Sequence, residues 1–84
     1  MAEKKQVGKV THFFSKISVA AVELTGALKV GDMISIEGGA GAIEQRVESM
    51  QMNNQPITEA KAGDVVGLKV LGKVKEGDRV YLGQ

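Results

Sequence analysis

Side chains capable of acid–base or metal chemistry are few in this sequence, and they are scattered. His12 is the single histidine, and Phe13 and Phe14 follow it directly. No nucleophile, base or further metal ligand lies at a usable spacing from it. We therefore interpret His12 as a structural or surface residue. Of the two phenylalanines, at least one is expected in the core, and the alternative is a stacking face for a nucleic-acid base.

Three aspartates belong to one repeated local pattern. The unit Lys-x-Gly-Asp, followed by a short alternating apolar run, occurs at Gly31-Asp32, Gly63-Asp64 and Gly77-Asp78. Glycine supplies the positive φ of a tight turn, and the aspartate is expected to bond backbone N–H groups just after it. These carboxylates are thus predicted to be structural. With no paired carboxylates, catalytic triad or metal cluster, the chain is predicted not to be an enzyme and to need no cofactor.

The polar residues best suited to binding lie near position 50. The amides of Gln51, Asn53 and Asn54 can bond base edges or backbone, although their alternative role is that of turn residues on a bulged strand. Lys9 and Lys16 belong to a basic group near the start of the chain. We expect these five residues near the surface that binds. Such basic groups are more often a solvated face, and Met50 and Met52 are expected as core filler.

Length and composition narrow the class of protein. The chain has 84 residues, a formal net charge of +1 and no cysteine. This predicts one small domain without a disulfide or a thiolate metal site, and it is not the overall charge of a nucleic-acid-binding protein. The lack of cysteine fits a cytoplasmic protein, and because no run is long and apolar enough for a membrane span, we expect no membrane partner. Residues 38–41 are glycine-rich, but no Lys-Ser/Thr pair follows, so no nucleotide is expected.

The apolar periodicity predicts strands rather than helices. Alternation is typical of strands at 6–14, 17–24, 33–37, 43–52, 65–70 and 79–82. A change of face is expected near Gly8. The step from Val47 to Met50 breaks the alternation and predicts a β-bulge. At most a turn is expected at 56–60. Residues 1–6 form a polar, frayed tail, and residues 7–84 form one domain.

So many short strands with glycine turns are typical of a sandwich or a barrel. A chain of this length has too few strands for two full sheets. We therefore predict an all-β domain, a small closed six-stranded Greek-key β-barrel.

Several motifs resemble domain 2 of the translational GTPases, the elongation factor Tu and initiation factor family. The resemblance is carried by 26–32 (GALKVGD), 47–54 (VESMQMNN), 56–68 (PITEAKAGDVVGL) and 79–80 after Gly77-Asp78, and it extends over residues 7–82. The chain is also similar to free-standing archaeal elongation factor-like barrels and to the C-terminal barrel of collagenase-like peptidases. It contains neither a phosphate-binding loop nor a peptidase body.

The resemblance implies a six-stranded Greek-key barrel and a function in binding. In factors that carry aminoacyl-tRNA, the strand end matching Gln51 helps to hold the acceptor end. We therefore expect a non-catalytic, translation-linked module, a monomer, that contacts rRNA, tRNA or the ribosome with one barrel face. The alternative is an accessory barrel that docks on a partner enzyme or GTPase-like protein, because fold alone does not fix function.

Overall fold

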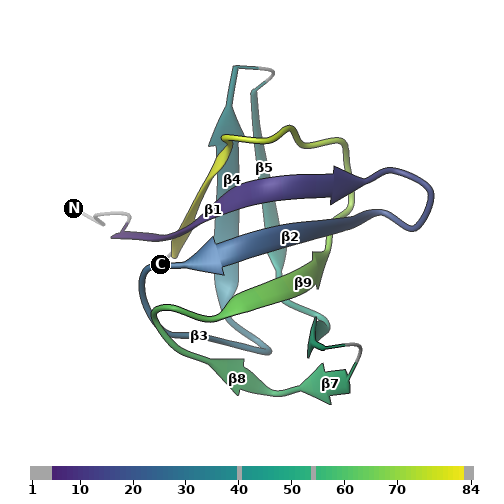
Figure 1. Cartoon of the computed structure of the whole chain (residues 1–84). Helices are drawn as coiled ribbons and strands as arrows, with labels where there is room; N and C mark the ends of the chain where they lie inside the picture. The colour runs from purple at the N-terminus through teal and green to yellow at the C-terminus, as the bar shows by residue number, and fades with distance from the viewer. Residues whose placement is uncertain (1–4, 40, 54, 83–84) are drawn as a thin grey trace.

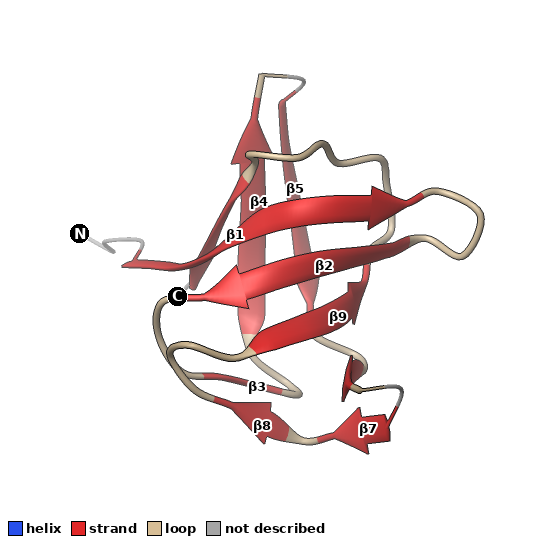
Figure 2. Cartoon of the chain, in the orientation of Figure 1, coloured by secondary structure: helices blue, strands red, loops and turns tan. Residues whose placement is uncertain are grey.

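The computed structural model describes residues 5–39, 41–53 and 55–82, and there it contains β-strands and no helix (Figures 1 and 2). Within these ranges, therefore, no helix could cross a membrane. The strands are β1 Lys5–Phe14, β2 Val19–Leu24, β3 Leu28–Lys29, β4 Met33–Gly38, β5 Gly41–Arg46, β6 Met50–Met52, β7 Gln55–Ile57, β8 Glu59–Ala60, β9 Val65–Lys69 and β10 Arg79–Leu82. The all-β class predicted from periodicity is confirmed.

One antiparallel sheet contains eight of these strands, in the order β5-β4-β10-β1-β2-β9-β6-β7, and β3 pairs with β8 separately. In Figure 1, β4 and β5 stand upright behind β1, β2 and β9, which cross in front of them, so the sheet curls around its own core. Closure of the backbone ladder into a six-stranded barrel is not found, because within the described residues the sheet ends at β5 and β7.

A buried glutamine joins the outer edge of β5 to the segment that follows β9. Gln45 is 5% exposed; its Nε2 donates to the Lys69 carbonyl at 2.8 Å, and its Oε1 accepts from the Leu71 N–H at 2.9 Å. The side-chain amide therefore satisfies the Lys69 carbonyl and the Leu71 N–H. In a continuous ladder, the backbone of a neighbouring strand would pair with these two groups. This contact closes the curled sheet where the ladder is open.

The inward face of the sheet forms one apolar core. Alternate residues of β9 and β4, such as Val66 with Leu68 and Ile34 with Ile36, are almost fully buried, as the two-residue period predicts. The cluster consists of Val7, Val10, Ala20, Val22, Leu24, Leu28, Ile34, Ile36, Val47, Met50, Val66, Leu68, Val70, Val74 and Val80. Met50 is core filler, as expected.

All three Gly-Asp pairs lie in turns of the same geometry. Gly31, Gly63 and Gly77 have φ of 100°, 95° and 93°. In each turn the aspartate Oδ2 accepts from the N–H of the lysine three residues earlier, at 3.1, 3.1 and 2.9 Å. The bonded N–H thus precedes the aspartate, contrary to the expectation that it follows. Each turn is therefore closed by two hydrogen bonds between the lysine and the aspartate. The lysine N–H donates to the aspartate carboxylate, and the aspartate N–H donates to the lysine carbonyl.

Each turn is also tied to one buried residue on another segment. The glycine N–H donates to that residue's carbonyl and the aspartate carbonyl accepts from its N–H, all at 2.7–2.9 Å. The turns at Gly31, Gly63 and Gly77 are bonded in this way to Val47, Leu24 and Val10, respectively. The repeated sequence unit is therefore a device that fixes a turn and anchors it to the core.

Strand β1 changes register as predicted near Gly8. Its pairing with β10 shifts between Gln6 and Gly8, and its pairing with β2 shifts again between Val10 and His12. Strand β2 begins at Val19 rather than Ile17, because residues 15–18 form the hairpin turn and Ser18 has a φ of 56°.

The prediction of one bulged strand over 43–52 is wrong. Strand β5 ends at Arg46, β6 begins at Met50, and Val47 between them pairs with the Gly31-Asp32 turn. The chain breaks because it changes partners: β5 pairs with β4, whereas β6 pairs with β7 and β9. Both Val47 and Met50 are 2% exposed, which is why the apolar alternation shifts there.

Over residues 56–60, where at most a turn is expected, the chain is extended in β7 and β8, with a bend at Thr58 between them. Pro56 lies in β7, the last strand of the ladder, where its missing N–H removes no inner hydrogen bond. The expected frayed tail, residues 1–6, falls mostly outside the described residues, although β1 already includes Lys5 and Gln6.

Candidate binding groove

The outward face of β2, β9 and β6 carries a shallow groove. The register places Gln51 of β6 opposite Gly67 of β9, Gly67 opposite Ala21 of β2, and Ala21 opposite His12 of β1. Because side chains alternate along a strand, Val19 and Ala21 point outward while Ala20 and Val22 enter the core.

Two adjoining hollows, of about 460 and 240 Å³, make up what we call the outer groove. They share Ile17, Val19, Gln51 and Gly67. The first is also lined by Phe14, Ala21, Met52, Asn53, Val65 and Val66, and the second by Ser49, Met50, Pro56 and Lys69.

Glycine forms the floor of the outer groove. A Cβ on Gly67 would lie 3.2 Å from Val19 Cγ1 and 3.3 Å from Gln51 Cγ. Any side chain there would project into the space between Val19 and Gln51. Gly67 therefore keeps the groove open and lets the Gln51 side chain lie across it.

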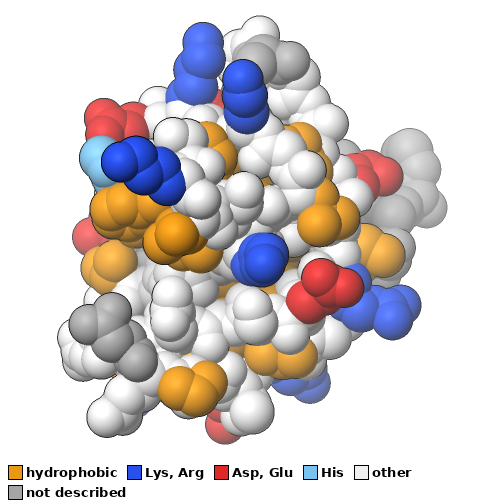
Figure 3. Space-filling view, turned by 90° about the vertical axis from the view of Figure 1, so that its right-hand side faces the viewer, with side chains coloured by type: hydrophobic (Ala, Val, Ile, Leu, Met, Phe, Trp, Pro, Cys, Tyr) orange, Lys and Arg blue, Asp and Glu red, His pale blue; other side chains and the backbone are white. Residues whose placement is uncertain are grey.

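Large apolar side chains are exposed around the groove. Phe14, Ile17 and Val65 are 46%, 59% and 49% exposed. Figure 3 shows hydrophobic side chains gathered beside the histidine on this side of the molecule. A cluster of exposed apolar residues on a small domain is a common mark of a binding surface.

His12 lies at the edge of this apolar cluster. Its Nδ1 is 2.9 Å from Glu76 Oε2, and its ring contacts Phe14 edge-on with centroids 4.5 Å apart. Both the histidine and the glutamate are more than half exposed. His12 is thus a surface residue, as expected. Among the described residues, no three His, Cys, Asp or Glu side chains are grouped to hold a metal ion.

No family model matches this chain. It is 48% identical over 80 residues to an uncharacterized protease of Methanocaldococcus jannaschii and 36% identical over 81 residues to a collagenase of Porphyromonas gingivalis. Each alignment covers 94% of this chain. It covers only 20% and 22% of those proteins, so the chain spans about a fifth of the length of these curated relatives.

Elongation factor 1-alpha of Pyrococcus horikoshii is 37% identical over 70 residues, which cover 74% of this chain and 16% of the factor. The resemblance to a translational GTPase domain is therefore supported, but less strongly than the resemblance to the protease segment.

A solved structure matches almost the whole fold. The C-terminal domain of a Geobacillus thermoleovorans putative U32 peptidase superposes with a TM-score of 0.86 over 90% of this chain and 96% of that domain. Their sequence identity is 16%, so this likeness establishes the shared fold. The fold matches the expected resemblance to the barrel of collagenase-like peptidases.

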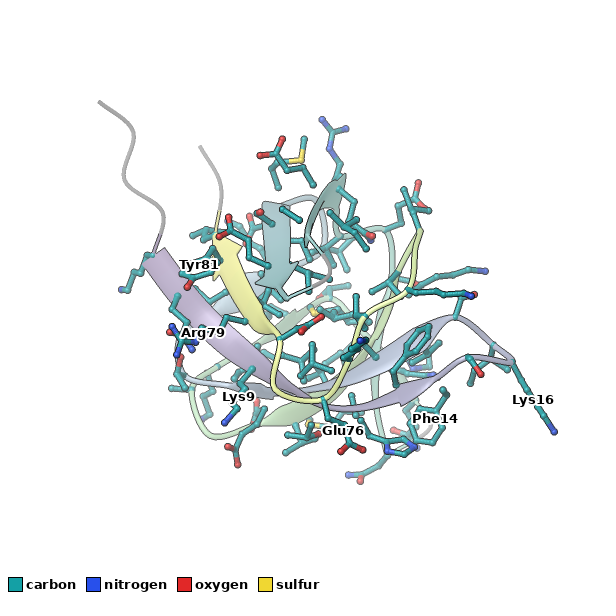
Figure 4. The ribbon with its side chains drawn as sticks, turned by 90° about the horizontal axis from the view of Figure 1, so that it is seen from above. Lys9, Phe14, Lys16, Glu76, Arg79 and Tyr81 are labelled. Atoms are coloured by element: carbon teal, nitrogen blue, oxygen red, sulfur yellow. The ribbon has the colours of Figure 1, made fainter. Side chains whose placement is uncertain are left out.

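The residues predicted to bind are only partly brought together. Gln51 and Asn53 line the outer groove, and Asn53 has the left-handed φ of 54° that asparagine tolerates. Asn54 lies outside the described residues. Figure 4 shows Lys9 along β1 and Lys16 projecting from the hairpin turn that follows this strand. Neither lysine lines the groove, so the groove brings together two of the four predicted residues that the structure describes.

Sequence reasoning missed most of the groove, although one signal was present. Ile17, Val19 and Ala21 share one face of their segment, opposite Val22 and Leu24, so the segment is apolar on both faces. In the structure Val22 and Leu24 are buried, and the other face forms a wall of the groove. Gly67 and Lys69 carried no such signal, because their role depends on which strands flank β9.

Proposed function

We propose that this chain is a non-catalytic accessory domain that docks onto a larger protein body. The observation that carries the proposal is the 48% identity, over nearly all of this chain, to a one-fifth segment of an M. jannaschii protein named as a protease. A fold shared with the C-terminal domain of a putative peptidase supports the same assignment. The partner we propose is a body similar to the remaining four-fifths of such proteins.

The chemistry of the outer groove supports binding rather than catalysis. Its lining contains no Asp, Glu or His side chain, and its single charged residue is Lys69. General acid–base chemistry needs a titratable group at the reacting atoms. Apolar walls with one central amide suit recognition of another molecule.

The test is binding in trans. The M. jannaschii relative without its matching segment is co-expressed with this chain and purified through a tag on the body. We expect co-purification and, by calorimetry, a 1:1 complex with a Kd in the micromolar range, about 10 μM. The intact relative is the matched control, because its own segment occupies the docking site. A soluble, folded body that captures no chain would overturn the proposal.

A second candidate is a translation-linked RNA-binding module, favoured by the similarity to elongation factor 1-alpha. RNA binding by a domain depends steeply on salt, because phosphate contacts release counterions. Titration with bulk tRNA at two salt concentrations therefore separates the candidates. Tight, strongly salt-dependent tRNA binding without capture of the body would replace the first proposal with the second.

A further inference from the structure

We infer that the outer groove binds an extended, apolar segment of the partner protein, with Gln51 pairing to its backbone. This inference rests on the proposed function and names the face and the ligand class through which docking occurs. Four observations carry it: the groove's length, its apolar walls, its central amide and its single charge.

The outer groove is elongated rather than a single pit. Its two hollows share Ile17, Val19, Gln51 and Gly67, so they adjoin across the glycine floor. One hollow continues to Phe14 and Val65, and the other continues to Pro56 and Lys69. An extended peptide places alternate side chains on one side of its backbone, and two adjoining hollows with partly apolar walls fit such a pair.

Gln51 offers a donor and an acceptor at the centre of this groove. Its Nε2 lies 3.7 Å from the position that a Cβ on Gly67 would take, so the carboxamide lies above the floor. Gln51 takes part in none of the side-chain hydrogen bonds found within residues 5–39, 41–53 and 55–82. A primary amide can pair at once with the N–H and the C=O of an extended backbone.

The molecule already contains that kind of pairing. Gln45 donates to the Lys69 carbonyl and accepts from the Leu71 N–H, two backbone groups that flank Val70. A glutamine amide thus pairs with the backbone of a segment that passes beside it, at the end of β9. Gln51 presents the same group to the outside, on β6, where Gly67 leaves room for an incoming chain.

Charge selects one end of the ligand. Lys69 is the single charged residue that lines the outer groove, at the hollow away from Phe14. An acidic side chain at that end of the segment complements it. One ammonium group in the groove and a formal net charge of +1 give little electrostatic attraction for a phosphate backbone. This favours a peptide over RNA as the ligand.

The probe is an acetylated, amidated heptapeptide, Glu-Val-Thr-Phe-Thr-Val-Glu, titrated into the full 15N-labelled chain. We expect amide shifts at Ala21, Gln51 and Gly67 and weak, saturable binding. N-methylation of the peptide's central residue removes one backbone donor, and Gln51→Ala removes both groups of the protein amide. Each is expected to weaken binding about three- to tenfold.

Variants separate the groove from the rest of the surface. Gly67→Leu fills the floor and is expected to abolish binding, while Gln55→Ala removes an exposed glutamine outside the groove and is expected to leave Kd unchanged. Because a Cβ on Gly67 would lie 3.2 Å from Val19 Cγ1, the folding of Gly67→Leu is checked first by its amide spectrum. Gln51→Ala and the N-methylated peptide test the inference independently of that variant.

The outcomes are distinct from those of the docking test. If the peptide causes no groove shifts while the chain still captures the partner body, the inference is overturned and the accessory-domain proposal stands. If adenosine monophosphate moves the same amides and the peptide does not, the groove takes a planar base and the inference is again overturned. Groove shifts that Gln51→Ala leaves undiminished would reject the role of the amide.

Discussion

At the scale of single residues, Gln45 is the buried polar side chain whose loss we expect to be most costly. Replacing it with alanine leaves the Lys69 carbonyl and the Leu71 N–H without their partner. We expect Gln45→Ala to lower the free energy of unfolding by about 2–3 kcal/mol, measured by urea denaturation. The exposed Gln55 is the matched control, and its change to alanine should cost less than about 0.5 kcal/mol. Equal effects of the two would contradict the role of Gln45 in closing the sheet.

Backbone conformation, rather than space, should decide the tolerance of the turn glycines. A Cβ on Gly63 or on Gly39 would meet no atom within 4 Å, but only Gly63 has a positive φ, of 95°. We expect Gly63→Ala to destabilise by about 1 kcal/mol and Gly39→Ala to be close to neutral. Thermal unfolding of both variants checks this. If Gly39→Ala were the more damaging change, the argument from φ would fail.

At the scale of elements, the sequence predicts what is local and misses what depends on distant partners. The Lys-x-Gly-Asp turns and the alternating β1, β4, β9 and β10 follow from neighbours in the chain. The break between Arg46 and Met50 does not, because it exists only where β5 and β6 pair with different strands. The two-residue strands β3 and β8 are too short to show any period.

The groove likewise could be predicted from the sequence only in part, because it depends on strands that are distant in the chain. Gln51 and Asn53 were predicted from residue type, and they line it. Its walls come from β2 and β9, and which face of these strands is outside follows from the curl of the whole sheet. Lys9 and Lys16 were chosen as basic residues close in sequence, but Lys9 lies within β1 and Lys16 in the turn beyond it, and neither lines the groove.

The edge strands are expected to open more readily than the centre. Residues of β7 are exposed or half-exposed, and its only partner in the ladder is β6. Strands β1 and β2 lie in the middle of the sheet and supply Val10, Ala20, Val22 and Leu24 to the core. Native-state hydrogen exchange should therefore be faster at Met52 than at Val22, by about tenfold or more. Equal protection would mean that β6 and β7 unfold only with the whole domain.

At the scale of the whole molecule, the contacts that close the fold connect distant parts of the chain. The three Gly-Asp turns grip Val47, Leu24 and Val10, and Gln45 joins the end of the ladder to the segment after β9. Breaking any one therefore loosens elements that are far apart in sequence. Such cross-connection favours unfolding as a single unit in a domain of this size.

We therefore expect one cooperative transition in guanidinium chloride. Tyr81, the single tyrosine, lies in β10 between β4 and β1, whereas far-UV circular dichroism reports on all the strands. The midpoints from tyrosine fluorescence and from dichroism should coincide in the native chain. They should move together in Gln45→Ala, because the lost contact joins β5, at one end of the ladder, to the segment after β9 on its far side. If the dichroism midpoint alone fell, β6, β7 and β9 would form a separately unfolding unit, and the three turns would not couple the sheet as we describe.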